Sequence, residues 1–183
     1  MGSGIAESVA RAGLPVTVRD VDEAAVGAAR GRVESSLDRA LAGGKIDEAG
    51  RDAILGRITL TTELDDLAGV DLVVEAVPEN VGLKARILGE VAGRVSERAL
   101  IASNTSSIPI AQLAANIDRP ERVLGLHFFS PVPVMNLVEV VVALDTSAET
   151  TATATEFAGR IGKTAIETKD RSGFIVNMLL VPY

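Results

Sequence analysis

The stretch VDLVVEAVPEN, residues 70–80, joins a short apolar run to an abrupt polar ending. Its shortness and its β-branched residues predict a strand that is buried on both faces. Runs of the same kind occur at five other places, residues 14–20, 58–62, 99–104, 122–129 and 135–143. The sequence therefore predicts a sheet built from several short, buried strands.

Ala-rich segments separate these runs. Apolar residues recur three and four positions apart in residues 22–41, 81–95 and 148–161, which is the spacing of a helix with one buried face. Gly43 and Gly44 supply a stop after the first of these helices. Strands that alternate with helices form βαβ units, so we expect an α/β protein with a mostly parallel sheet covered on both faces.

Composition limits the function classes. With 183 residues, 47% hydrophobic content and a mean hydropathy of +0.28, the chain can bury one ordinary core. The net charge of −7 argues against nucleic acid or an anionic membrane as partner. There is no apolar run of the ~18 residues that a membrane span needs. The absence of cysteine fits a cytoplasmic location, and a single histidine leads us to expect no metal site.

The N-terminal segment MGSGIAESVARAG, residues 1–13, is typical of a glycine-rich turn that runs into a helix, although no strand precedes it. If Gly2 is the last glycine of such a turn, Asp20 follows it by 18 residues at the end of a strand, where a carboxylate can bind ribose hydroxyls. Asp20 could instead be an ordinary helix N-cap. Val21 offers no charge to a 2′-phosphate, which favours NAD over NADP.

Polar residues also follow two further predicted strands. They are Glu79, Asn80, Ser103, Asn104, Thr105, Ser106 and Ser107. In an open parallel sheet the ligand binds at the carboxyl ends of the strands, so this position indicates a binding site. Each residue taken alone could be a loop or cap residue, which is a common role of Asn and Ser after a strand.

His127, the sole histidine, and Glu139 lie in two neighbouring apolar runs. A carboxylate removed from water needs a hydrogen-bond donor, and an imidazole can supply one ring N–H while its other nitrogen accepts a proton. Together the two side chains suit general base catalysis. Neither periodicity nor spacing proves that they meet.

The chain resembles the NAD-dependent 3-hydroxyacyl-CoA dehydrogenases, including the bacterial 3-hydroxybutyryl-CoA enzymes. The resemblance is carried, in family order and spacing, by MGSGIA (1–6), DLVVEAVPEN (71–80), ASNTSSIPI (102–110), GLHFFSPVPVMNLVEVV (125–141), GK (162–163) and DRSGFIVNMLLVPY (170–183). It implies a Rossmann-like, doubly wound fold and oxidation of a 3-hydroxyacyl-CoA to a 3-oxoacyl-CoA in fatty acid β-oxidation or butyrate metabolism.

The resemblance also implies roles for individual residues. His127 would be the general base on the substrate's 3-hydroxyl group, and Glu139 would orient it. Ser106 and Asn177 would hydrogen-bond the reacting oxygen or its partners. The implied NAD-binding residues are Asp20, Glu79, Lys84 and Asn104, which join Gly2 of the glycine-rich turn. Ser36 matches a position near the coenzyme A moiety.

Several positions depart from the family pattern. Ser130 stands where Asn is usual, Asn136 where Lys is common, and Met178 where Arg commonly follows the Asn. The family's first strand and two earlier glycines are not in the sequence, and we expect that the chain is a fragment. We assign residues 1–171 to an N-terminally truncated NAD-binding domain and residues 172–183 to the start of an all-helical second domain, which would form the homodimer in the full-length protein.

Two other functions stay open. A related Rossmann dehydrogenase would act on a small hydroxy acid, and a non-catalytic, crystallin-like protein would keep the fold as a scaffold. A substrate panel distinguishes the first from an acyl-CoA enzyme. The joint presence of His127, Glu139, Ser106 and Asn177 argues against the scaffold, whereas truncation argues for loss of function.

Overall fold

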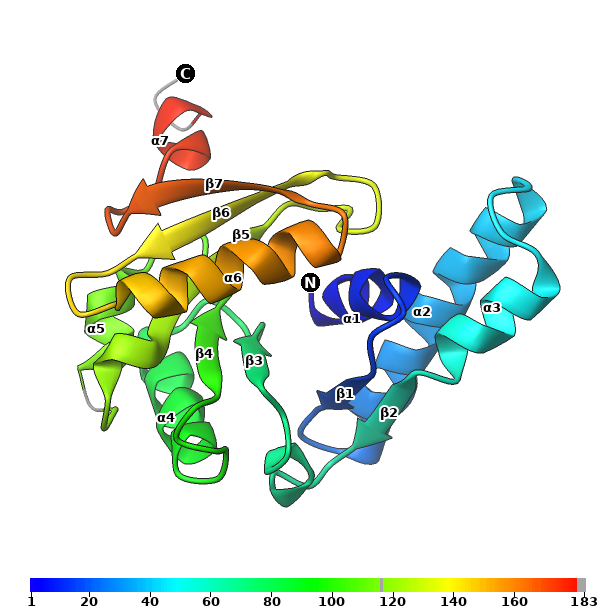
Figure 1. Cartoon of the computed structure of the whole chain (residues 1–183). Helices are drawn as coiled ribbons and strands as arrows, with labels where there is room; N and C mark the ends of the chain where they lie inside the picture. The colour runs from blue at the N-terminus through cyan, green and yellow to red at the C-terminus, as the bar shows by residue number, and fades with distance from the viewer. Residues whose placement is uncertain (116, 181–183) are drawn as a thin grey trace.

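The computed structural model describes residues 1–115 and 117–180 and contains a two-stranded and a five-stranded sheet (Figure 1). In the smaller one, β1 (Val16–Arg19) pairs with β2 (Ile58–Thr61). The larger sheet has the order β3-β4-β5-β6-β7. Its strands are β3 (Leu72–Glu75), β4 (Leu100–Ser103), β5 (Val123–Phe128), β6 (Leu137–Val142) and β7 (Thr164–Lys169). All neighbours are parallel except β5 and β6, so the predicted mostly parallel α/β sheet is confirmed.

The described residues form helices on both faces of the larger sheet, beside the smaller sheet and beyond β7 (Figure 1). They are α1 (Gly2–Arg11), α2 (Glu23–Ala42), α3 (Glu48–Leu55), α4 (Val81–Ala92), α5 (Ile110–Ala114), α6 (Ala148–Arg160) and α7 (Val176–Leu180). Short 3-10 helices span Asp65–Leu67 and Pro120–Arg122. Helices α4 and α5 pack on one face, and α1 and α6 pack on the other.

Alternation along each strand explains the continuous apolar runs. In β4, Ile101 faces the core cluster under α4 and α5, whereas Ala102 faces the cluster under α1 and α6. Val123 and Leu124 of β5 divide between the two clusters in the same way. Because both faces are covered here, no polar alternation is needed, and the central strands β4 and β5 are mostly apolar.

Side-chain caps begin four of the helices. Asp22, Asp47, Asn80 and Ser147 each accept a hydrogen bond from a backbone N–H in the first turn of α2, α3, α4 and α6. Asn80 is therefore a helix cap, one of the roles that the sequence left open for it. Asp22 rather than Asp20 caps α2, so the N-cap hypothesis for Asp20 is wrong.

One strand of the structure was not predicted from the sequence. Strand β7 carries charged and exposed residues along its length because it lies at the edge of the sheet, where only one neighbour covers it. Helix α3 and the short α5 were missed as well. The apolar runs identified the better buried strands, and these elements lack such runs.

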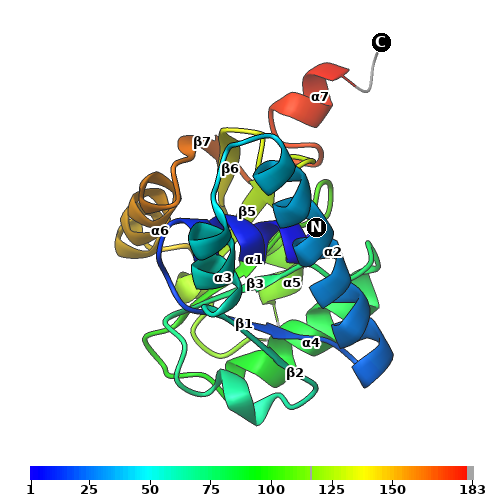
Figure 2. The same cartoon turned by 90° about the vertical axis from the view of Figure 1, so that its right-hand side faces the viewer.

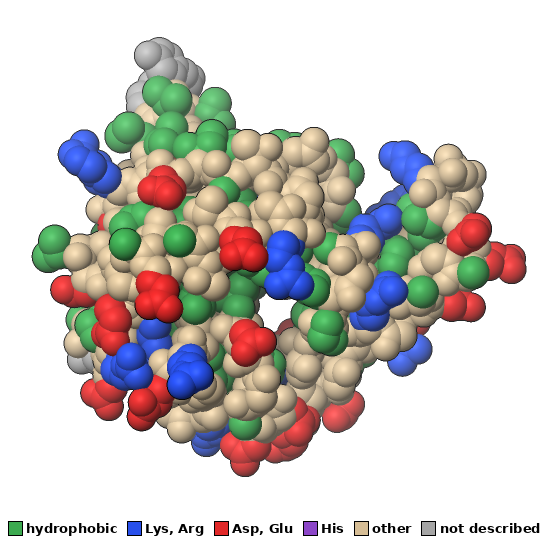
Figure 3. Space-filling model, in the orientation of Figure 1, with side chains coloured by type: hydrophobic (Ala, Val, Ile, Leu, Met, Phe, Trp, Pro, Cys, Tyr) green, Lys and Arg blue, Asp and Glu red, His purple; other side chains and the backbone are tan. Residues whose placement is uncertain are grey.

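The two sheet sections do not pair with each other within the described residues. Space-filling Figure 3 shows an opening through the molecule between the two parts, with acidic and basic side chains interspersed on this face. Helix α7 projects beyond β7 in both views of Figures 1 and 2. Within residues 1–115 and 117–180, no helix is long and apolar enough to cross a membrane.

Candidate active site

His127 and Glu139 lie directly opposite each other on the antiparallel strands β5 and β6. The distance from His127 Nδ1 to Glu139 Oε2 is 2.6 Å, and only 7% of the histidine and 1% of the glutamate are exposed. Gly125 lets these strands approach, because a Cβ there would lie 2.7 Å from Cβ of Val141. The register of the strands, not their distance in sequence, brings the two side chains together.

The environment of Glu139 determines the state of the imidazole. Its second oxygen, Oε1, accepts hydrogen bonds from the backbone N–H groups of Ile175 and Val176, each at 3.0 Å. These bonds replace the water that the buried carboxylate has lost. An ionised carboxylate can only accept, so opposite ionised Glu139 a neutral His127 imidazole has its proton on Nδ1 and its lone pair on Nε2. The pair can therefore accept a proton at Nε2.

A second cluster is centred on Glu79, in the loop after β3. Its carboxylate accepts hydrogen bonds from the Thr105 hydroxyl and the Ser106 N–H and lies 3.3 Å from Nζ of Lys84. Burial alone would raise the pKa of Glu79, but the Thr105 and Ser106 hydrogen bonds and the Lys84 charge outweigh it and lower the pKa to about 2. Glu79 is thus an anion at neutral pH, and its hydrogen bonds connect the loop after β3 to the loop after β4.

The side chain of Lys84 is buried, and its ammonium group is paired with acceptors of the protein. Only 1% of its side chain is exposed, and Nζ bonds both carboxylate oxygens of Glu75 and the carbonyl of Val77. Glu75 also accepts a 2.6 Å hydrogen bond from the Ser103 hydroxyl. Lys84 therefore faces the interior and reaches the outer surface of this loop only through Glu79.

Sequence reasoning missed Glu75. The signal was present in VVEAV, residues 73–77, where a carboxylate interrupts a buried strand nine residues before Lys84. An ionised group within such a strand needs a partner of opposite charge. Lys84, on the inner face of the following helix, is that partner.

Asn104, Ser106 and Asn177 link the two clusters. Oδ1 of Asn104 accepts the N–H of Phe128, next to the histidine, at 2.9 Å. Nδ2 of Asn177 donates to the Ser106 carbonyl at 3.2 Å, one residue after the Val176 amide that binds Glu139. The structure thus brings the four candidate catalytic residues, Ser106, His127, Glu139 and Asn177, to the same end of the larger sheet.

The other predicted residues lie in the N-terminal part. Helix α1 begins at Gly2, and a Cβ there would lie 3.8 Å from Cβ of Ala76, so the start of α1 adjoins the carboxyl end of β3. Asp20 follows β1, and its Oδ1 accepts the N–H of Val21 at 2.8 Å. Ser36 lies half-buried in α2, and no hydrogen bond joins it to the other predicted residues within the described chain.

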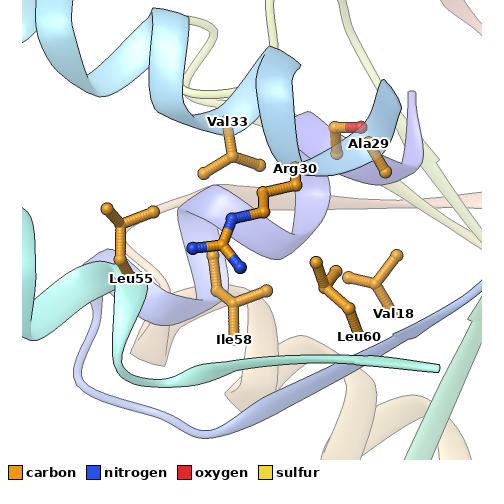
Figure 4. A pocket seen from close by; sticks show the side chains of 8 residues that line it. Val18, Ala29, Arg30, Val33, Leu55, Ile58 and Leu60 are labelled. Atoms are coloured by element: carbon orange, nitrogen blue, oxygen red, sulfur yellow. The ribbon is translucent and has the colours of Figure 1, made fainter. Parts of the chain in front are cut away.

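A separate cavity of about 60 Å³ lies between α2 and the small sheet (Figure 4). It is lined by Ser3, Val18, Ala29, Arg30, Val33, Leu55, Ile58 and Leu60. Ligand pockets usually measure several hundred Å³ and contain convergent polar groups. This small, mostly apolar space contains none of the predicted site residues. We also find no cluster of three or more metal-ligating side chains in the part of the chain that the structure describes.

Comparison with known proteins identifies the family. Residues 1–171 match the family described as 3-hydroxyacyl-CoA dehydrogenase, NAD binding domain. A 3-hydroxybutyryl-CoA dehydrogenase of Mycobacterium tuberculosis is 51% identical over 185 aligned residues, which cover 100% of this chain and 65% of that protein. A probable 3-hydroxybutyryl-CoA dehydrogenase of Deinococcus radiodurans is 42% identical, again over 100% of this chain and 65% of the relative.

Solved structures agree. The crystal structure of M. tuberculosis FadB2 matches with a TM-score of 0.98 and 51% identity, covering 100% of this chain and 65% of that one. (S)-3-hydroxybutyryl-CoA dehydrogenase PaaH1 from Ralstonia eutropha matches with a TM-score of 0.97 and 46% identity, covering 100% and 64%. The chain spans about 65% of the length of the curated relatives named above. It belongs to the 3-hydroxyacyl-CoA dehydrogenase family, and its residues 1–171 are the Rossmann-like NAD-binding domain of that family.

Proposed function

We propose that this chain supplies the coenzyme-binding and proton-transfer part of an enzyme that oxidises a 3-hydroxyacyl-CoA to a 3-oxoacyl-CoA. The observation that carries the proposal is the buried His127–Glu139 pair, whose 2.6 Å contact uses Nδ1, while Nε2 of the imidazole has no hydrogen-bond partner in the part of the chain that the structure describes. A base with one fixed proton and one free nitrogen suits removal of a proton from an alcohol.

In this mechanism, Nε2 of His127 takes the proton of the substrate's 3-hydroxyl group. Glu139 stabilises the imidazolium that forms, and its bonds to the Ile175 and Val176 amides hold it in place. When bound, NAD provides the nicotinamide that accepts the hydride from C3. Ser106 and Asn177 lie together near this pair, where their polar groups would hydrogen-bond the reacting oxygen.

The residues of the N-terminal part fit a dinucleotide. Oδ2 of Asp20 has no hydrogen-bond partner within the described residues, so this carboxylate oxygen can accept the ribose hydroxyls of NAD. Gly2 would allow the diphosphate to approach the start of α1. Glu79, held in place by Lys84, and Asn104 would shape the side of the site nearest the nicotinamide. Ser36 would lie near coenzyme A, as family resemblance implies.

Partners form part of the same proposal. Met178, Leu179 and Leu180 of α7 are 49%, 60% and 66% exposed, and such an apolar surface usually has a partner. We propose that residues from 172 onward begin a second, helical domain through which the protein forms a homodimer. Residues 181–183 lie outside the described residues. The proposed substrate is an acyl-CoA, with a cytoplasmic location and no nucleic-acid or membrane partner.

A chimaera tests the proposed function. Residues 1–183 would replace the matching part of the M. tuberculosis relative, which is 51% identical to them. We expect NADH formation, followed by absorbance, when the chimaera receives NAD and 3-hydroxybutyryl-CoA. A folded, NAD-binding chimaera that oxidises small hydroxy acids but no 3-hydroxyacyl-CoA would contradict the proposal and support the other dehydrogenase function. Absence of turnover with every substrate would support the scaffold.

A further inference from the structure

The turn between β7 and α7 has an uncommon backbone conformation. Gly173 has a φ of 79° and Phe174 a φ of 51°, both in the left-handed region. Glycine adopts that region at no cost, but a bulky aromatic residue does so only where its surroundings compensate for the strain. Hydrogen bonds from Phe174 N to the Arg171 carbonyl and from Met178 N to the Gly173 carbonyl close the turn. The strained residue therefore lies inside a well-bonded turn.

The ring of Phe174 lies against the imidazole. Phe174 is 1% exposed, and its ring centroid is 5.6 Å from that of His127 with the planes tilted by 58°. Phe129 lies 4.6 Å from the imidazole at a tilt of 54°. These separations are within the range of favourable aromatic contacts. Two aromatic rings and the Glu139 carboxylate thus restrict the movement of the imidazole.

The residues that follow Phe174 bind the other member of the pair. The left-handed turn directs the amides of Ile175 and Val176 toward Oε1 of Glu139, while Oε2 remains for His127. The same short turn therefore contacts both the imidazole and its carboxylate partner. If the backbone at Phe174 relaxed, the ring contact and the two amide bonds would change together.

We propose that Phe174 is a positioning residue: its ring restrains His127, and its left-handed backbone presents two amides that restrain Glu139. The consequence is that the proton stays on Nδ1 and the lone pair stays on Nε2. The importance of this arrangement for catalysis rests on the proposed function. The arrangement itself is a property of the chain without substrate or coenzyme.

The single histidine makes a direct test possible. Long-range ¹H–¹⁵N NMR of the 183-residue chain, at about pH 8 where an ordinary imidazole is neutral, reports which ring nitrogen carries the proton. We expect the Nδ1–H form in the wild type. In Phe174→Leu we expect signals averaged between the two tautomers and exchange of the Nδ1 proton with solvent faster by roughly tenfold.

A matched control separates positioning from packing. Phe157→Leu makes the same replacement on α6, where Phe157 is partly buried and packs against the core cluster on the opposite face of the sheet. It should lower stability while leaving the His127 signals unchanged. A folded Phe174→Leu chain with wild-type tautomer and exchange would overturn the proposal, as would an equal change in Phe157→Leu.

A second variant tests the contribution of the backbone amides that bind Glu139. Val176→Pro removes one of the two N–H groups that bind Glu139, at the first residue of α7, where proline is tolerated. We expect partial loss of the Nδ1–H form with the Phe174 ring intact. If Phe174→Leu does not fold, this variant decides, and an unchanged His127 spectrum refutes the proposal. Both measurements omit substrate and NAD, so their outcome is independent of the chimaera's turnover.

Discussion

Two clusters of ionisable side chains, buried except for Glu79, lie at the same end of the larger sheet, and they use their polar atoms differently. In the Glu75–Lys84–Glu79 cluster, the lysine ammonium bonds two carboxylates and a carbonyl. In the His127–Glu139 pair, both carboxylate oxygens are hydrogen-bonded, but Nε2 of the imidazole has no hydrogen-bond partner within the described residues. The comparison indicates that burial and charge pairing alone do not identify a reactive group. A base that is held in place by its neighbours and keeps one nitrogen available for a proton does identify one.

The largest effect is expected when the proposed base, Nε2 of His127, is removed. His127→Gln keeps a polar side chain but removes the base, so we expect the rate of 3-hydroxybutyryl-CoA oxidation by the chimaera to fall ~100 to 10,000-fold. Steady-state NADH formation measures the loss. NAD affinity, measured by calorimetric titration, should stay close to that of the unsubstituted chimaera. Near-normal turnover would show that His127 is not the base and would remove the distinction between the clusters.

The next largest effect is expected in the Glu75–Lys84–Glu79 cluster. Lys84→Met leaves Glu75 buried without its counter-charge, and we expect the free energy of unfolding to fall by about 3–5 kcal/mol. Urea denaturation followed by circular dichroism measures it. Arg86→Met on the same helix removes an exposed ion pair with Glu90 and should cost less than about 0.5 kcal/mol. Similar losses in the two variants would show that the buried cluster does not have the structural role assigned to it.

A pH series tests the electrostatics of Glu79. Its pKa in the folded chain is about 2, below the ordinary 4.5, so ionised Glu79 stabilises the fold above about pH 4.5. That contribution is lost as the pH falls from 4.5 toward 2. We expect the urea midpoint of the wild type to decline more steeply in this window than that of Glu79→Gln. Parallel curves would show that the hydrogen bonds from Thr105 and Ser106 do not favour the ionised form.

The smallest effect concerns the helix that carries Lys84. Asn80 caps α4 through a 2.9 Å hydrogen bond from the Leu83 N–H, and Asn80→Ala should cost about 1 kcal/mol. Thermal unfolding measures the change, and Asn80→Asp, which keeps the cap, is the control. A loss as large as that of Lys84→Met would mean that the cluster depends on the helix start rather than on charge pairing.

Much of the fold could be predicted from local pattern. The buried strands are continuous apolar runs because both faces of the sheet are covered, and the Ala-rich segments between them are helices. Strand β7 was missed because an edge strand with exposed charges has no such run. Asp20 and Asp22 were not distinguished, because both residues lie between a strand and a helix and only backbone geometry shows which one caps.

The candidate site was predictable in part. Polar residues after β3 and β4 pointed to the sheet's carboxyl edge, and Glu79 and Thr105 do meet there. The carboxylate of Glu75 within a buried strand indicated the need for a cationic partner, but that Lys84 is this partner depends on how α4 packs on the sheet. The position of Phe174 could not be predicted either, since nothing in the sequence indicates that this apolar residue has a left-handed backbone conformation.

By itself the sequence determined the residue types, the alternation of strands with helices and the order of the family motifs, because these depend on local periodicity and composition. Only the tertiary structure decided that Glu139 faces His127, since an antiparallel register sets that contact across 12 residues. It also decided that the turn at Phe174 contacts both side chains, and the amide bonds from this turn to Glu139 join residues 36 and 37 positions apart. Contacts between distant segments follow from packing and strand pairing, which local patterns do not encode.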